Sequence, residues 1–124
     1  MENLHIARKK DTLEIHFDAE TGVLVLEGAS YPENPIEFFD PLYAWLKQYI
    51  HEIGGALTVK ITINYLNTSS SKCILDFLEI LENYHVSGGE VKLDWYYEEN
   101  DEDMLETGEE LCEDLELSYA MIPY

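Results

Sequence analysis

Basic residues are scarce in this chain, and their scarcity excludes two classes of partner. Seven lysines and arginines oppose 26 aspartates and glutamates, which gives a formal net charge of −19. A chain this acidic repels nucleic-acid phosphates and anionic membrane surfaces, so we expect neither as a partner. No apolar run approaches the ~18–20 residues that cross a bilayer, and the polar segment Met1 to Asp11 lacks a signal-peptide core.

Cysteine is also scarce, with Cys73 and Cys112 far apart and no CxxC pair. Free cysteine behaves as a small hydrophobe, so we expect two buried thiols in a cytoplasmic protein.

Motifs that carry common enzyme chemistry are missing. There is no GxxxxGK[ST], GxGxxG or GxSxG segment. The histidines occur in different elements without metal-ligand spacing: His5, His16, His51 and His85. The acidic run 98–103 lacks the central glycine and final glutamate of an EF-hand loop, so it is interpreted as a solvated helix start. We therefore predict no enzymatic activity, no metal and no cofactor.

The sequence does contain enough apolar residues for one core. Hydrophobic residues make up 46% of 124 positions, and no repeat or long linker divides them, so we expect a single domain over residues 1–124. Thr12 to Asp18 alternates apolar and polar residues, which predicts a half-buried strand, and Ala19 to Gly22 reads as a hairpin turn. Val23 to Leu26 is apolar throughout, which predicts a central strand covered on both faces, before a loop from Gly28 to Pro35.

Helical spacing then alternates with further strands. Asn34 and Pro35 are a cap and first residue of a helix that ends at Gly54 and Gly55. The next predicted elements are a strand over 57–65, a helix from about 69 to 84, a strand over 91–97, a helix over 101–115 and a short edge strand over 117–122. Gly108 lies on the apolar stripe of the last helix, which indicates close packing there. The predicted fold class is α/β: a small mixed sheet with three helices packed on it, in β-β-α-β-α-β-α order with a possible last strand.

One segment between a strand and a helix is rich in hydroxyls: Asn67-Thr68-Ser69-Ser70-Ser71-Lys72. Loops at this edge of an α/β sheet commonly meet ligands and partners. A helix cap needs a single side-chain oxygen, and this segment offers more. Two interpretations stay open, a capping turn and a phosphoacceptor whose phosphate Lys72 reaches back to meet.

Acid is concentrated near the C-terminus. Asp94 to Glu116 holds twelve carboxylates, and no lysine or arginine follows Lys92. This surface either steers a basic protein partner or serves only solubility, and the composition favours neither.

Three segments resemble the SiaC-type regulatory phosphoproteins, in the same order along the chain. Leu26 to Pro35 resembles the family's loop into its first helix, Tyr65 to Lys72 its phosphoacceptor segment, and Asp94 to Met104 its strand leading to an acidic helix. With the stretches between them, the resemblance covers most of Leu13 to Leu115.

The resemblance implies a fold like that of anti-sigma-factor antagonists, the STAS domains. It implies phosphorylation of Thr68 by a Ser/Thr kinase with a histidine-kinase-like ATPase domain, reversed by a PP2C-type phosphatase. The unmodified protein would bind and control a diguanylate cyclase or another output protein. The residues assigned to the phosphosite surroundings are Asn67, Ser69, Ser70, Ser71 and Lys72, and those assigned to partner contact are Tyr31, Pro32, Glu33 and Asn34. The alternative is a constitutive acidic protein-binding module without a phospho-switch.

Overall fold

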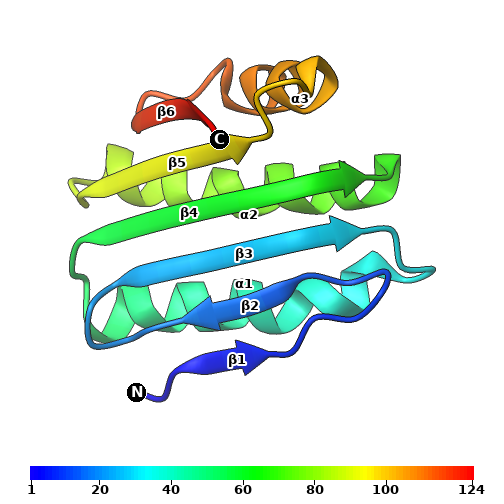
Figure 1. Ribbon diagram of the computed structural model, residues 1–124. Helices are drawn as coiled ribbons and strands as arrows, with labels where there is room; N and C mark the ends of the chain where they lie inside the picture. The colour runs from blue at the N-terminus through cyan, green and yellow to red at the C-terminus, as the bar shows by residue number, and fades with distance from the viewer.

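A six-stranded sheet in the order β1-β2-β3-β4-β5-β6 forms the centre of the molecule (Figure 1). The computed structural model describes residues 1–124. The first two strand pairings are antiparallel and the other three are parallel. The elements are β1 Leu4–Ile6, β2 Glu14–Phe17, β3 Val23–Ser30, α1 Pro35–Glu52, β4 Leu57–Leu66, α2 Thr68–Val86, β5 Val91–Tyr97, α3 Glu102–Cys112 and β6 Ser118–Pro123. The mixed sheet with three helices confirms the predicted α/β class.

The first and last strands refine the predicted order. β1 was missed because three residues are too short for a periodic signal, although Leu4 and Ile6 pair with Phe17 and Ile15 of β2. The predicted edge strand is present as β6, and Pro123 is its last residue. The full order is therefore β-β-β-α-β-α-β-α-β.

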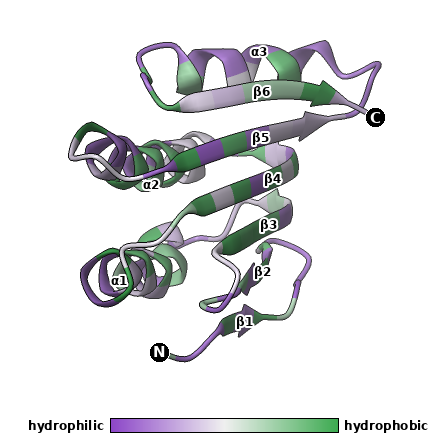
Figure 2. Cartoon of the chain, turned by 90° about the vertical axis from the view of Figure 1, so that its left-hand side faces the viewer, coloured by the Kyte–Doolittle hydropathy of each residue, from purple (hydrophilic) through white to green (hydrophobic).

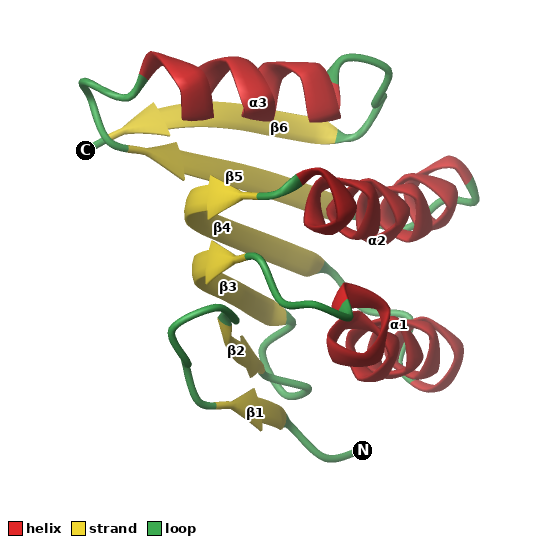
Figure 3. Cartoon of the chain, turned by 90° about the vertical axis from the view of Figure 1, so that its right-hand side faces the viewer, coloured by secondary structure: helices red, strands yellow, loops and turns green.

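The sheet buries one face more deeply than the other, which corrects the prediction for the central strand. Figure 3 shows α1 and α2 on the same side of the sheet. Along β3, Leu24 and Leu26 are fully buried, while Val23 and Val25 stay half-exposed on the opposite face. In Figure 2, β3 is hydrophobic along its first half, whereas β5 alternates hydrophobic and hydrophilic bands. The continuous apolar run of β3 therefore predicted a strand covered on both faces, although the helices cover only one. None of the helices is long and apolar enough to cross a membrane.

Helix boundaries follow the predicted caps, with two differences. The Asn34 side chain accepts a hydrogen bond from the Glu37 backbone N–H, and Pro35 opens α1 as expected. α2 is longer than predicted at both ends. α3 ends at Cys112, before the predicted end, and the chain that follows is held by the Glu82 carboxylate of α2, which accepts hydrogen bonds from the backbone N–H groups of 116 and 117.

Gly108 brings α3 into close contact with β5, as predicted. The Trp95 indole Nε1 donates a hydrogen bond of 3.1 Å to the backbone oxygen of Met104. A Cβ on Gly108 would lie 2.5 Å from that same Nε1, so only glycine leaves room for the indole.

Candidate functional site

The hydroxyl-rich segment lies where β4 passes into α2, beside the loop that leads from β3 into α1 (Figure 1). Both connections follow parallel strands and therefore meet at the same edge of the sheet. A groove of about 600 Å³ lies between the first turns of the two helices, and its lining residues are Glu33, Asn34, Pro35, Ile36, Thr68, Ser69, Lys72, Cys73 and Asp76.

The structure divides the hydroxyls into two groups. Ser70 is fully buried, and its Oγ accepts a 2.8 Å hydrogen bond from Oγ of Ser30 at the end of β3. Asn67 caps α2, since its Oδ1 accepts a 2.8 Å hydrogen bond from the Ser70 backbone N–H. Ser71 is half-buried, whereas Thr68 and Ser69 are exposed. The capping interpretation accounts for Asn67 and Ser70 and leaves two exposed hydroxyls without a structural role.

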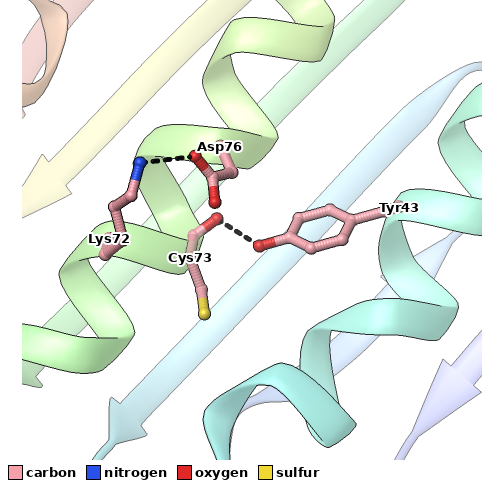
Figure 4. Close-up of polar contacts among 4 residues, drawn as sticks. All are labelled: Tyr43, Lys72, Cys73 and Asp76. Carbon is pink, nitrogen blue, oxygen red and sulfur yellow. Dashed lines mark hydrogen bonds and ion pairs between the residues drawn. The ribbon is translucent and has the colours of Figure 1, made fainter.

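The first turns of α2 are tethered to their surroundings. The Asn67 backbone N–H donates to the Ser30 backbone oxygen at 3.1 Å. From α1, the Tyr43 hydroxyl donates to the Cys73 backbone oxygen at 2.7 Å (Figure 4). Burial, together with this hydrogen bond, raises the pKa of Tyr43, so the phenol stays protonated as a donor. The exposed Thr68 and Ser69 hydroxyls therefore belong to a helix start that is held in place by hydrogen bonds.

Lys72 is engaged within its own helix. Its Nζ lies 3.1 Å from Oδ1 of Asp76, one turn further along α2 (Figure 4), and this hydrogen bond is the main cause that raises the pKa of Lys72. In the unmodified chain Lys72 therefore pairs with Asp76 on the same helix face, and its reach toward a phosphate on Thr68 stays a prediction.

Exposed large side chains lie on the two connections that meet at this edge of the sheet. Tyr31 and Tyr65 are 37% and 53% exposed and meet edge to face, with ring centroids 5.6 Å apart. Ile36, which lines the groove with Thr68, is 61% exposed. Of the assigned contact loop, Tyr31, Glu33 and Asn34 are exposed and Pro32 is half-buried.

Tyr65 and Ile36 were missed as surface residues. The alternation along 57–65 predicts Tyr65 in the core, but the register shifts after Gly28, which pairs with Ile63 while Ala29 pairs with Tyr65. The extra residue, Asn64, turns Tyr65 to the surface. Ile36 carried a signal, since it lies off the apolar stripe of its helix.

A second surface is acidic. The outer side of α3 and β6 form a groove of about 520 Å³, lined by Glu106, Glu109, Glu110, Glu113, Tyr119 and Met121. The ion pairs of the structure, Arg8–Glu27 and Lys72–Asp76, both lie elsewhere, so these glutamates have no cation of their own. The start of α3 is a capped helix end, because the Asp101 carboxylate accepts a 3.0 Å hydrogen bond from the Met104 N–H.

Histidines and cysteines form no metal centre. No group of three or more histidine, cysteine, aspartate or glutamate side chains is arranged to hold an ion. His5 and His16, expected to be unrelated, face one another across β1 and β2 with ring centroids 4.5 Å apart. Cys73 and Cys112 are both buried free thiols, as expected.

Comparisons with known proteins agree on one family. The model of the SiaC family regulatory phosphoprotein matches residues 6–124. An uncharacterized protein of Pseudomonas aeruginosa (strain UCBPP-PA14) is 36% identical over 121 residues, which cover 98% of this chain and 96% of that protein. The crystal structure of apo-SiaC from Pseudomonas aeruginosa has a TM-score of 0.92 at 34% identity, covering 98% of this chain and 99% of that one.

A further solved structure holds a relative with its target. It is described as diguanylate cyclase SiaD in complex with its activator SiaC from Pseudomonas aeruginosa, and the match has a TM-score of 0.94 at 35% identity, covering 98% of this chain and 99% of the matched one. The family model and both crystal structures extend over nearly the whole chain. The chain therefore belongs to the SiaC family of regulatory phosphoproteins, and it is a regulatory protein rather than an enzyme.

Proposed function

We propose that this chain is a phosphorylation-switched activator of a diguanylate cyclase. A partner Ser/Thr kinase with a histidine-kinase-like ATPase domain phosphorylates Thr68, and a PP2C-type phosphatase removes the phosphate. The unmodified form binds the cyclase. The relative SiaC of Pseudomonas aeruginosa is the activator of the diguanylate cyclase SiaD in a solved complex of the two. The proposal places the chain in the cytoplasm, where such kinases and cyclases find their nucleotides. The observation that carries it is the exposed Thr68 hydroxyl on a fixed helix start, beside exposed apolar side chains.

Accessibility favours Thr68 as the acceptor. A kinase must bring the hydroxyl oxygen to the γ-phosphate of ATP, and the buried, hydrogen-bonded Ser70 cannot be presented in this way. The N–H groups of Thr68 and Ser69 have no partner within the helix, because they belong to its first turn. Those groups and the helix dipole favour an anion at this position.

The phosphate acts on the surface and leaves the fold intact. An anion near a helix N-terminus is stabilising by about 0.3–1 kcal/mol, and the contacts from Ser30 and Tyr43 hold the turn in place. The modification adds about −1.5 to −2 charges to a groove that is also lined by Ile36, Glu33 and Asp76. The Lys72 ammonium that lies on this face is already paired with Asp76. A partner that is apolar or acidic at this edge therefore loses affinity.

Two measurements on the full chain test the switch. The chain, Thr68→Ala and the matched control Ser69→Ala are incubated with the partner kinase and ATP, and the modified residue is identified by mass spectrometry. We expect phosphate on Thr68 in the chain and in the control, and none in Thr68→Ala. Affinity for the cyclase and melting temperature are then measured for both phosphoforms. We expect about tenfold or greater loss of affinity, equivalent to about 1.4 kcal/mol, with an unchanged or slightly higher melting temperature.

Two results would contradict this mechanism. Phosphate on Ser69 would move the acceptor site. A large fall in melting temperature on phosphorylation would mean that the switch acts by unfolding rather than at the surface.

The acidic groove on α3 favours a second candidate, a constitutive acidic binding module. Its unpaired glutamates attract a basic partner whatever the state of Thr68. In that case affinity stays equal in both phosphoforms. For either candidate, association should slow several-fold as salt rises, because exposed charges are screened beyond about 8–10 Å. An association rate that does not change with salt concentration would show that the exposed carboxylates do not attract the partner.

A further inference from the structure

β6 is the outermost strand of the sheet, so the backbone groups on its outer side have no partner strand. At its end, the Tyr124 N–H donates to the Tyr97 oxygen and the Tyr124 oxygen accepts from the Glu99 N–H. Residues of a strand direct both backbone groups alternately to its two sides. Ser118, Ala120 and Ile122 therefore bond to β5, and Tyr119 and Met121 direct their N–H and C=O groups to the open edge.

The opposite edge shows how such an edge is protected. β1 has only three residues and is followed by Arg8, Lys9 and Lys10, so it offers little to pair with. β6 spans six residues, carries no charged side chain, and has a proline only at its last position. β6 is therefore the edge that remains open to another strand.

The open edge coincides with the glutamates of α3. The side chains of Tyr119 and Met121, whose backbone groups are unpaired, line the same groove as Glu106, Glu109, Glu110 and Glu113. A strand added to β6 would direct alternate side chains into this groove, because its pleat must match that of β6. Those side chains would meet carboxylates that have no cation from this chain.

We propose that the β6 edge and the α3 glutamates together bind an extended segment of a partner protein with lysine or arginine at alternate positions. Main-chain hydrogen bonds to Tyr119 and Met121 provide the register, and the glutamates select the basic side chains. The site is separate from the Thr68 groove, and the inference holds whether or not Thr68 is phosphorylated.

The test uses the full-length, isotope-labelled chain and two short synthetic peptides matched in length to β6. One alternates lysine and threonine; the other has the same sequence with alternate backbone nitrogens methylated. Methylation keeps the charge but removes the donors that strand pairing needs. We expect the first peptide to shift the Tyr119 and Met121 amide signals most and to slow their hydrogen exchange. We expect the methylated peptide to bind about tenfold more weakly, since it loses two or more hydrogen bonds.

Charge-matched variants separate the groove from general acidity. Glu109→Gln/Glu113→Gln should weaken binding of the first peptide by about tenfold. Glu2→Gln/Glu20→Gln removes the same charge from exposed positions near the other edge and should change affinity little. Three results would overturn the proposal: equal binding of both peptides, equal loss in both variants, or no shift at Tyr119 and Met121.

Discussion

The first turn of α2 and the outer side of α3 differ in whether their charged and polar groups have partners. Around Thr68 several polar groups have partners: Ser70 bonds to Ser30, Tyr43 to Cys73, and Lys72 to Asp76. On α3, the groove glutamates have none. One phosphate added to the ordered, nearly neutral turn changes its local charge decisively, whereas the same charge on α3 would join many others.

This difference assigns different physical tasks to the two surfaces. A surface whose polar groups are held in place can bind a partner differently when Thr68 is phosphorylated and when it is not, because the partner contacts depend on fixed positions. A diffuse array of exposed like charges attracts a partner from a distance and is screened by salt. The chain therefore separates switching from attraction in space.

The largest effect is expected where α3 meets the sheet. In Gly108→Ala, the added Cβ would lie 2.5 Å from the Trp95 Nε1, which forces the indole away and strains its hydrogen bond to Met104. Such overpacking costs about 1–3 kcal/mol of unfolding free energy. Urea unfolding measures the loss, and Thr107→Ala on the same helix is the control. A loss no larger than that of the control would show that α3 is not packed tightly against Trp95.

An effect of similar size is expected at the first turn of α2. Ser70→Ala leaves the buried Ser30 hydroxyl without its partner, at a cost of about 1–3 kcal/mol. The exposed neighbour Ser69→Ala should stay within about 0.5 kcal/mol of the unaltered chain. In the double variant Ser30→Ala/Ser70→Ala the loss should be smaller than the sum of the single losses, because no orphaned hydroxyl remains. Strict additivity in chemical unfolding would mean that the two serines do not hold the turn.

The smallest effect concerns the two thiols, one beneath each surface. Burial raises the pKa of the Cys112 thiol from its usual 9.0 to about 11, and burial also raises that of Cys73. At neutral pH Cys112 should hold about a hundredfold less thiolate than an exposed cysteine, so its alkylation should be slower than that of Cys73. Alkylation followed by mass spectrometry gives both rates. A faster reaction at Cys112 than at Cys73 would contradict the close packing of α3 that buries Cys112.

The raised pKa of Cys112 should make the folded state less stable as pH rises above 9.0. The unfolded thiol ionises near pH 9.0, whereas folded Cys112 stays protonated until about 11. Its contribution is therefore fully present below pH 9.0 and is lost as pH rises toward 11. Cys112→Ala should flatten the fall in melting temperature over this window, and an unchanged slope would show that another group causes it.

Much of the framework was predictable because its causes are local. Asn34 with Pro35 and the capping Asn67 mark helix starts through contacts within a few residues, and alternation marks β2 and β4. Gly108 was recognised as a packing glycine because a mid-helix glycine on an apolar stripe is otherwise unfavourable. The segment from Asn67 to Lys72 was likewise found from composition alone.

Tertiary contacts decided how that segment is used. Four consecutive hydroxyls are chemically similar in the sequence, but only the end of β3 makes Ser70 a buried, bonded residue and leaves Thr68 outside. A shift of register opposite Gly28 turned Tyr65, three residues before Thr68, from the predicted core to the surface. Pairing of β1 with β2 brought His5 against His16, although neither strand predicts the other.

The sequence by itself determined the helices, most strands, the acidity and the place of the hydroxyl segment, because periodicity, capping and charge depend on neighbouring residues. Only the tertiary structure decided which face of β3 is covered, which hydroxyls are exposed, and that the open edge of β6 lies against the α3 glutamates. Burial and edge exposure depend on contacts between residues far apart in the chain, and no local pattern encodes them.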